Sequence, residues 1–235
     1  MFSLSRINKN FKKNDCIIYY LSIFIYYVNK FKHESVAHPN KILWVNPQTI
    51  NYNVKPSLKI DKIIYKGAIK EGDWDLKVKS FNQHKKHVSM KQFFLEGIKW
   101  ENTKMFKKNY HVKLKEGNKA RGFTNLDDLI AYYQNDVELL FEKIKKDGFK
   151  IPGNRLNKND MYVYIDRNGK ILLGANGNHR LSLAKIIGLK KIPVRVHIRH
   201  KDWQKKRDII NKLKTNGGLN DSKLLNHPDL QDVIK

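Results

Sequence analysis

The residues best suited to chemistry are Gly177, Asn178, His179 and Arg180, which lie between the apolar run ILLG and the helical pattern LSLAKII. Glycine lets the backbone approach a ligand, and the free N–H groups of a helix start attract anions. A cation in the first turn disfavours an unliganded helix by about 0.3–1 kcal/mol. A bound phosphate, held by the arginine fork, therefore explains Arg180. The alternative is that Asn178 caps the helix and Arg180 is solvated.

A second group of candidates is acidic: Asp73 and Asp75 in GDWD, with Glu96 and Glu101 around EGIKWENT. A phosphotransferase needs a carboxylate to orient or deprotonate an acceptor hydroxyl, and often another for Mg²⁺. The adjacent glycines and tryptophans suit a rigid loop over a pocket. We therefore expect this segment to fold against Gly177–Arg180, with Asp73 or Asp75 as the catalytic base. Alternatively, the tryptophans are core anchors and the carboxylates pair with lysines.

The elements that position these residues follow from hydrophobic periodicity and turn signals. Arg167-Asn168-Gly169 predicts a hairpin between strands 161–166 and 170–174. A helix over 178–187 and a strand over 192–198 follow. The remaining expected elements are a short strand within 38–50, a strand-like run at 61–78, and helices at 80–97, 124–149 and from 201 onward. The fold class is α+β, with a small mixed sheet and flanking helices.

The formal charge of +25 over 235 residues is large enough to attract nucleic acid, nucleotides or anionic membrane surfaces. Most of the cations are lysines, and asparagine is also frequent, which is typical of proteins encoded by AT-rich DNA. The charge therefore has two interpretations, a specific polyanion site or a compositional bias. Non-specific nucleic acid stays a candidate partner.

The cysteine count and the apolar run near the N-terminus restrict the expected cellular compartment. Cys16 is the single cysteine, which excludes disulfide frameworks and cysteine zinc sites and favours a reducing cytoplasm. The histidines His179, His197 and His200 have no recognised metal-ligand spacing, so no metal site is predicted. The apolar run 16–28 is shorter than the roughly 20 residues that span a bilayer. We expect a helix docked on the body, with docking on a membrane surface or a partner as alternatives.

The segment ILLGANGNHRLSLAKIIGLKKIPVRV resembles the signature of the ParB/sulfiredoxin superfamily. The matching features are a strand followed by a Gly-x-x-Arg helix start. The small residue Ala184 follows four positions after the arginine, and a glycine and the strand sequence IPV come next. WVNPQTI resembles the first-strand box of that domain, and LLFEKIKKDGFKIP resembles the helix before its hairpin. This resemblance implies an N-terminal helical extension over 1–35, a ParB/sulfiredoxin-like domain over 36–200 with a helical insertion at about 61–135, and a C-terminal helix and tail over 201–235.

The resemblance also implies a ligand. ParB proteins bind the triphosphate of CTP at this helix start, and sulfiredoxin and an ADP-dependent free-serine kinase bind adenine-nucleotide phosphates there. The matching positions are Gly177, Asn178, His179 and Arg180. Asn178 stands where sulfiredoxin has its reactive cysteine, which excludes that reaction. Too few residues follow His200 for the helix-turn-helix and dimerisation regions of partition proteins.

The favoured function is therefore nucleotide binding, with ATP, ADP or CTP as ligand. Turnover would make the protein a phosphotransferase or nucleotide hydrolase that acts, with Mg²⁺, on a small hydroxylated substrate. Two alternatives stay open: a ParB-like DNA-binding or nuclease-like protein, and a nucleotide-gated binding module without turnover. The sequence does not specify the base, the acceptor substrate or the oligomeric state.

Overall fold

The structure is a computed structural model, and it describes residues 4–54, 63–153, 156, 160–174, 176–215 and 222–234. Seven strands of this part form one mixed sheet: β1 Ile42–Val45, β2 Tyr52–Val54, β3 Ala68–Lys70, β4 Val78–Ser80, β5 Tyr162–Ile165, β6 Ile171–Leu173 and β7 Ile192–His200. The strand order is β1-β7-β5-β6-β2-β4, and β3 pairs with β7 beyond the end of β1. The pairs β5–β7, β3–β7 and β2–β6 are parallel, and the others are antiparallel.

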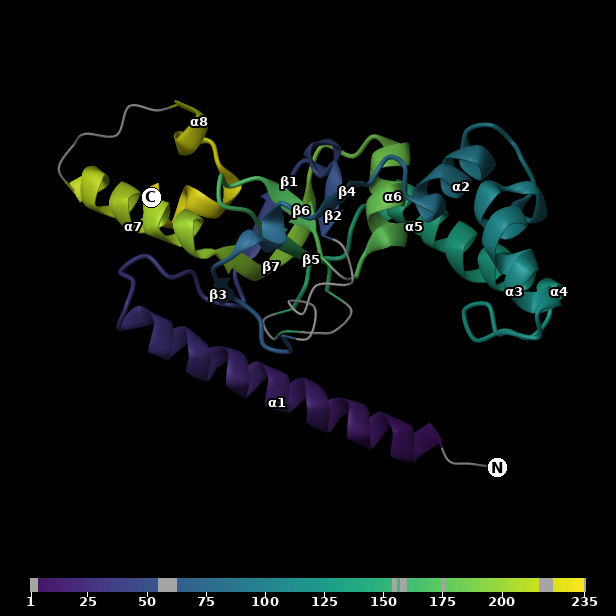
Figure 1. Ribbon diagram of the computed structural model, residues 1–235, viewed down its shortest axis with the longest axis horizontal. Coiled ribbons are helices and arrows are strands. Elements are labelled where there is room, and N and C mark those ends of the chain that lie inside the picture. Colours follow the sequence, from purple (N-terminus) through teal and green to yellow (C-terminus); the bar gives the residue numbers. More distant parts are fainter. Residues whose placement is uncertain are drawn as a thin grey trace.

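Helices surround the sheet, with α7 and α8 at one end of the molecule, α2 to α5 at the other, and α1 along the bottom (Figure 1). Their bounds are α1 Leu4–Lys30, α2 Lys85–Phe94, α3 His111–Lys115, α4 Leu126–Tyr132, α5 Leu139–Asp147, α6 Asn178–Ile187, α7 Lys201–Thr215, α8 Ser222–Leu225 and α9 Gln231–Ile234. Single turns of 3-10 helix cover Pro47–Thr49, Asp73–Asp75, Trp100–Asn102 and Pro228–Leu230, and π-helical turns cover Phe106–Tyr110 and Tyr133–Glu138. The α+β class with a mixed sheet and flanking helices is confirmed.

The hairpin β5–β6 forms where the Asn-Gly signal predicts it. The Asp166 carboxylate accepts the backbone N–H groups of Asn168 and Lys170 at 2.9 and 2.7 Å. Gly169 closes the turn with a φ of +89°, and a Cβ there would lie 2.4 Å from the Trp203 ring. The turn therefore needs glycine both for its backbone conformation and for the approach of α7.

Alternate residues of the central strands enter two cores. Val163 and Ile165 of β5 join α6, α7 and the C-terminal segment in the larger core, whereas Tyr164 faces Trp74 and Ile198 on the opposite side. Every residue of β7 is buried. This agrees with a central strand that is covered on both faces.

The insertion at about 61–135 contributes strands as well as helices. Its strands β3 and β4 join the sheet, next to β7 and β2 respectively. The helix expected at 124–149 is interrupted, since a π-helical turn separates α4 from α5. The helices from α2 to α5 form a third core around Trp100, Phe106 and Tyr133, and Leu183 of α6 also packs into this core. The helical part of the insertion therefore packs on α6.

Helix α1 docks on the body through one face. Ser22 is buried, and its hydroxyl donates to the Ile18 carbonyl at 2.6 Å and accepts the Lys66 N–H at 2.8 Å. The Tyr26 ring packs edge-on against His38 at 5.0 Å. None of the helices within the described ranges combines the length and the apolarity needed to cross a bilayer.

A buried ion network holds the C-terminal segment on the sheet. The Asp229 carboxylate accepts from Arg199 at 2.6 and 2.9 Å and from the Trp203 indole at 3.0 Å, and Arg207 lies 3.2 Å away. Burial alone would raise the pKa of Asp229, but the charges of Arg199 and Arg207 outweigh burial and lower this pKa below its usual range. Residues 228–234 are therefore part of the fold.

The substitution Asp229→Ala should reduce the free energy of unfolding by about 3–5 kcal/mol, because it leaves buried Arg199 without its carboxylate and removes one of the two carboxylates that contact buried Arg207, the other being Asp232. Urea unfolding measures this loss. Asp202→Ala is the control, since that carboxylate is 54% exposed and its loss should change stability by less than about 0.5 kcal/mol. Equal losses in the two variants would contradict the role of the network.

Candidate functional site

Backbone conformation and close packing both require glycine at the start of α6. Gly177 has a φ of +103°, and a Cβ there would lie 2.7 Å from the Met161 side chain. Gly177 itself occupies the cap position and Asn178 is the first helical residue, so the expectation that Asn178 caps the helix is wrong. The Asn178 side-chain oxygen is buried without a hydrogen-bond partner in the described part of the chain. Burial lowers the pKa of Arg180, and the Asp160 charge partly opposes this.

The acidic candidates lie elsewhere. Asp75 is buried and binds Arg167 through two hydrogen bonds of 2.7 and 2.8 Å, and Asp73 binds the same guanidinium at 2.7 Å. Arg167 stands in the turn of the β5–β6 hairpin, whereas Gly177 follows the other end, where Gly174 pairs with Tyr162. Asp73 and Asp75 are therefore bound by Arg167 at the turn end of the hairpin, and the expected contact with Gly177–Arg180 is not among the contacts of these two carboxylates.

The two tryptophans of these segments are structural. Trp100 and Trp74 are buried core residues, as the simpler interpretation expects. The Trp100 indole donates to Glu138 at 2.8 Å, and Glu96 is exposed. None of these carboxylates is among the described residues that line a cleft between the β2–β4 edge of the sheet and the helical part of the insertion.

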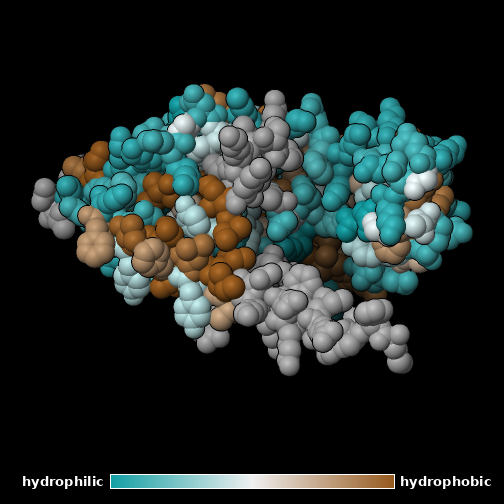
Figure 2. Space-filling model, turned by 60° about the horizontal axis from the view of Figure 1, so that its bottom comes forward, coloured by the Kyte–Doolittle hydropathy of each residue, from teal (hydrophilic) through white to brown (hydrophobic). Residues whose placement is uncertain are grey.

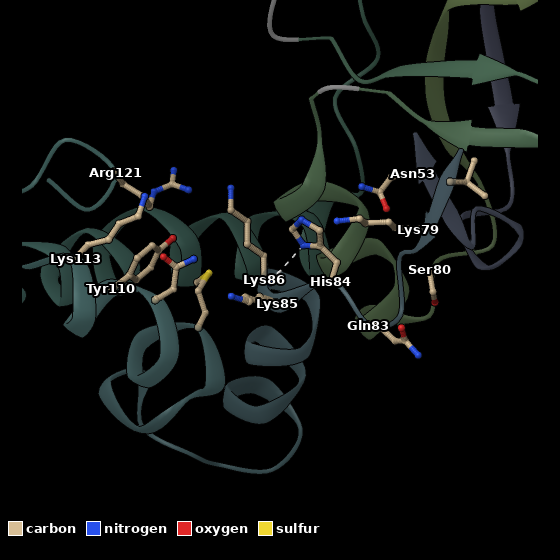
Figure 3. Close-up of a pocket in the computed structure, with 13 residues that line it drawn as sticks. Asn53, Lys79, Ser80, Gln83, His84, Lys85, Lys86, Tyr110, Lys113 and Arg121 are labelled. Carbon is tan, nitrogen blue, oxygen red and sulfur yellow. Dashed lines mark hydrogen bonds between the residues drawn. The ribbon is translucent and has the colours of Figure 1, made fainter. Parts of the chain in front are cut away.

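A basic cleft of about 860 Å³ separates the β2–β4 edge of the sheet from the helical part of the insertion. Figure 3 shows Arg121, Lys113 and Tyr110 on one side, Asn53 and Lys79 on the other, with the start of α2 between them. The cations that line it are Lys79, Lys85, Lys86, Lys113 and Arg121, together with the imidazole of His84. The other lining residues are Asn53, Val78, Ser80, Gln83, Met105, Asn109 and Tyr110.

Helix α2 begins at this cleft. His84 caps it, since the His84 Nδ1 accepts the Lys86 N–H at 3.3 Å. The ring therefore carries its proton on Nε2, which leaves a donor for a ligand. Lys85 and Lys86 occupy the first turn, which holds no acidic residue, although the helix dipole disfavours cations there. A bound anion would offset this cost at α2, where two cations share the first turn, as it would at Arg180.

Arg121 projects from a strained turn. Its φ is +55°, and Gly122 follows with a φ of +95°. Ala120 and Phe123 exchange both backbone hydrogen bonds, at 2.9 and 3.0 Å, around these two residues. Two positive φ values in such a turn are those of type I′, which favours Asn-Gly. An arginine in the left-handed region costs about 1 kcal/mol, and such strain is common at functional sites.

The Arg121 side chain links the cleft to the predicted helix start. Its guanidinium donates to the Tyr132 hydroxyl at 2.8 Å and lies 4.8 Å from the centre of that ring. It also lies 3.4 Å from the His179 Nε2. Since arginine only donates, this nitrogen accepts and the imidazole is neutral. His179 thus contacts a cation of the cleft.

Several like charges lie close together in the cleft. Burial and the nearby Arg121 charge both lower the pKa of Lys86. Burial, then the charges of Arg121, Lys86 and His84, lower the pKa of His179 to about 3. No carboxylate lines the cleft within the described residues, so this repulsion has no internal compensation. An anion bound there would relieve it.

The other histidine candidates have separate partners. His197 and His200 each lie within hydrogen-bond distance of a backbone carbonyl, that of Ile63 at 2.8 Å and that of Gly72 at 2.9 Å. Across the described ranges, no group of three His, Cys, Asp or Glu side chains is arranged to hold a metal ion.

The sequence reasoning missed Arg121, Lys85 and Lys86. Their signals are present in the sequence: two lysines directly follow a histidine at a helix start, and Arg-Gly stands between Ala120 and Phe123. The turn is recognised only once those two residues are seen to pair.

The strain at Arg121 can be measured with two substitutions that both remove the guanidinium. We expect Arg121→Gly to be about 1 kcal/mol more stable than Arg121→Ala, because glycine adopts a positive φ without a steric penalty. Urea unfolding gives the difference. At Lys119, whose φ is not positive, the order should reverse, with alanine the more stable. Equal stability of the two Arg121 variants would contradict the strain.

His179 should contribute to the pH dependence of stability. Its pKa is lowered to about 3 in the fold, below the value of the unfolded chain, so the unfolded state binds more protons. Stability should therefore fall as pH decreases from about 6.5 toward 3. NMR titration of the imidazole tests this, and protonation of His179 near pH 6.5 in the folded protein would contradict its buried, neutral state.

No protein-family model, no curated protein and no solved structure matches this chain. The resemblance to the ParB/sulfiredoxin superfamily stays a prediction that rests on the quoted motifs.

Proposed function

We propose that the protein binds a nucleotide in the basic cleft and holds it through its phosphate groups. The observation that carries this proposal is the set of cations around the start of α2, with no carboxylate among the described lining residues. The volume of about 860 Å³ falls in the usual range for small-molecule sites, and a nucleotide fits such a space.

The phosphates would lie against the start of α2. The free N–H groups of a helix start and its dipole favour a phosphate, and Lys86, Arg121 and the His84 Nε2 add charged or polar donors. The side-chain amides of Asn53, Gln83 and Asn109 offer donors and acceptors to a base. They do not by themselves select ATP, ADP or CTP.

The composition of the cleft favours binding over turnover. A phosphoryl acceptor needs a carboxylate to orient it, and Mg²⁺ needs oxygen ligands. Asp73 and Asp75, the carboxylates expected to act, are bound to Arg167. Of the predicted alternatives, a nucleotide-gated binding module is therefore better supported than a phosphotransferase or hydrolase.

Calorimetric titration with ATP, ADP and CTP tests the proposal. We expect Lys86→Ala to weaken binding about tenfold or more, because a hydrogen bond to a charged group contributes about 1.5–3 kcal/mol. Lys91→Ala is the matched control, since Lys91 is an exposed lysine on the same helix and does not line the cleft. Unchanged affinity in Lys86→Ala would contradict the assignment.

The same titration separates the cleft from the helix start of α6. Arg180 does not line the cleft, so Arg180→Ala should leave affinity within about twofold of the parent protein if the phosphates bind at α2. Loss of binding in Arg180→Ala alone would move the phosphates to Gly177–Arg180, as the superfamily resemblance implies.

Nucleic acid is the second candidate ligand, favoured by the net charge of +25. Binding driven by charge alone should be independent of sequence and should weaken steeply between about 50 and 200 mM salt. A sequence-selective complex that persists at the higher salt concentration would favour nucleic acid over the nucleotide.

A further inference from the structure

An apolar stripe runs along the outer face of α1. Its residues are Ile17, Tyr20, Phe24, Tyr27 and Phe31, which are 54%, 65%, 63%, 58% and 91% exposed. The first four lie on one side of α1, at a spacing of three and four residues, and Phe31 directly follows the end of the helix at Lys30. We call this set the aromatic stripe. Figure 2 looks at the face on which α1 lies and shows apolar side chains gathered on its left half.

The aromatic stripe is not needed to hold α1 on the body. The opposite face makes that contact, through buried Ser22 and through the Tyr26 ring against His38. Five large side chains thus stay in water on a helix that is already docked, and such a patch usually marks an interaction surface.

Charge decides which partner suits this surface. Across α1 the sequence has the basic residues Arg6, Lys9, Lys12, Lys13 and Lys30 against the single acidic residue Asp15. Lys30 and Lys32 are exposed at the end of the stripe. A second copy of the chain would bring two charges of +25 together, whereas an anionic surface would be attracted.

The chemistry of the stripe also suits a lipid surface. Tyrosine rings are enriched at the headgroup level of bilayers, where one end of the ring is apolar and the other is hydrated. A helix with basic residues and an aromatic face lies in the plane of the interface without crossing the bilayer. We propose that the aromatic stripe docks the protein on an anionic lipid bilayer.

The test is co-sedimentation of the full chain with lipid vesicles. We expect binding to vesicles of equimolar phosphatidylglycerol and phosphatidylcholine, and much weaker binding to pure phosphatidylcholine. The double variant Phe24→Ser/Phe31→Ser keeps the charge and removes two exposed rings, so its affinity should fall at least about tenfold. The tyrosines stay unchanged, because Tyr20 and Tyr27 pack on neighbouring rings.

The control is Leu95→Ser/Leu139→Ser, which removes two exposed apolar side chains far from α1 in the sequence, one at the end of α2 and one at the start of α5. It should bind the anionic vesicles as the parent protein does. Circular dichroism checks that α1 keeps its helicity in the stripe variant. Equal binding of the parent and the stripe variant would overturn the proposal, because attraction by charge alone would then explain the binding. A dimer that the stripe variant dissociates, without vesicle binding, would assign the stripe to a second copy instead.

Discussion

The scarcity of carboxylates is the constraint on which the rest of this structure depends. The chain has 22 acidic residues against 47 lysines and arginines. Several of these carboxylates pair with arginines inside the fold, because a buried arginine without a partner would lower the stability of the folded state. Asp229 lies between Arg199 and Arg207, Asp160 faces Arg195, and Asp75 binds Arg167. These pairs hold the central strand β7, the C-terminal segment and the hairpin turn in place.

The basic cleft follows from the same constraint. Lysines around the start of α2 and the guanidinium of Arg121 face one another without a carboxylate in the described lining. The folded chain therefore contains two unfavourable features at this place, the repulsion between the cations and the backbone strain at Arg121. Tyr132 and His179 both contact the guanidinium, so two neighbours hold it in position. For the proposed anion, such preorganisation would raise affinity by lowering the ordering cost of binding.

Local patterns predicted the local structure well. Helix α6 spans 178–187 as expected, the hairpin turn is at Asn168-Gly169, and β7 begins at Ile192. Contacts between segments that lie far apart in the sequence were harder to predict. Nothing in GDWD indicates that Arg167, far along the chain, would neutralise Asp73 and Asp75, or that Ala68–Lys70 would pair with β7. The cleft was missed for the same reason, since its walls come from β4, α2 and the Arg121 turn, which meet only in the folded chain.

We propose that anions bind at the start of α2 rather than at the start of α6. A crystal structure of the protein soaked with tungstate, with anomalous scattering used to locate the metal of this phosphate analogue, tests this most directly. We expect anomalous density between Lys86, Arg121 and the His84 Nε2. Density confined to the backbone N–H groups after Gly177, beside Arg180, or no density in a cleft that is open in the crystal, would contradict it.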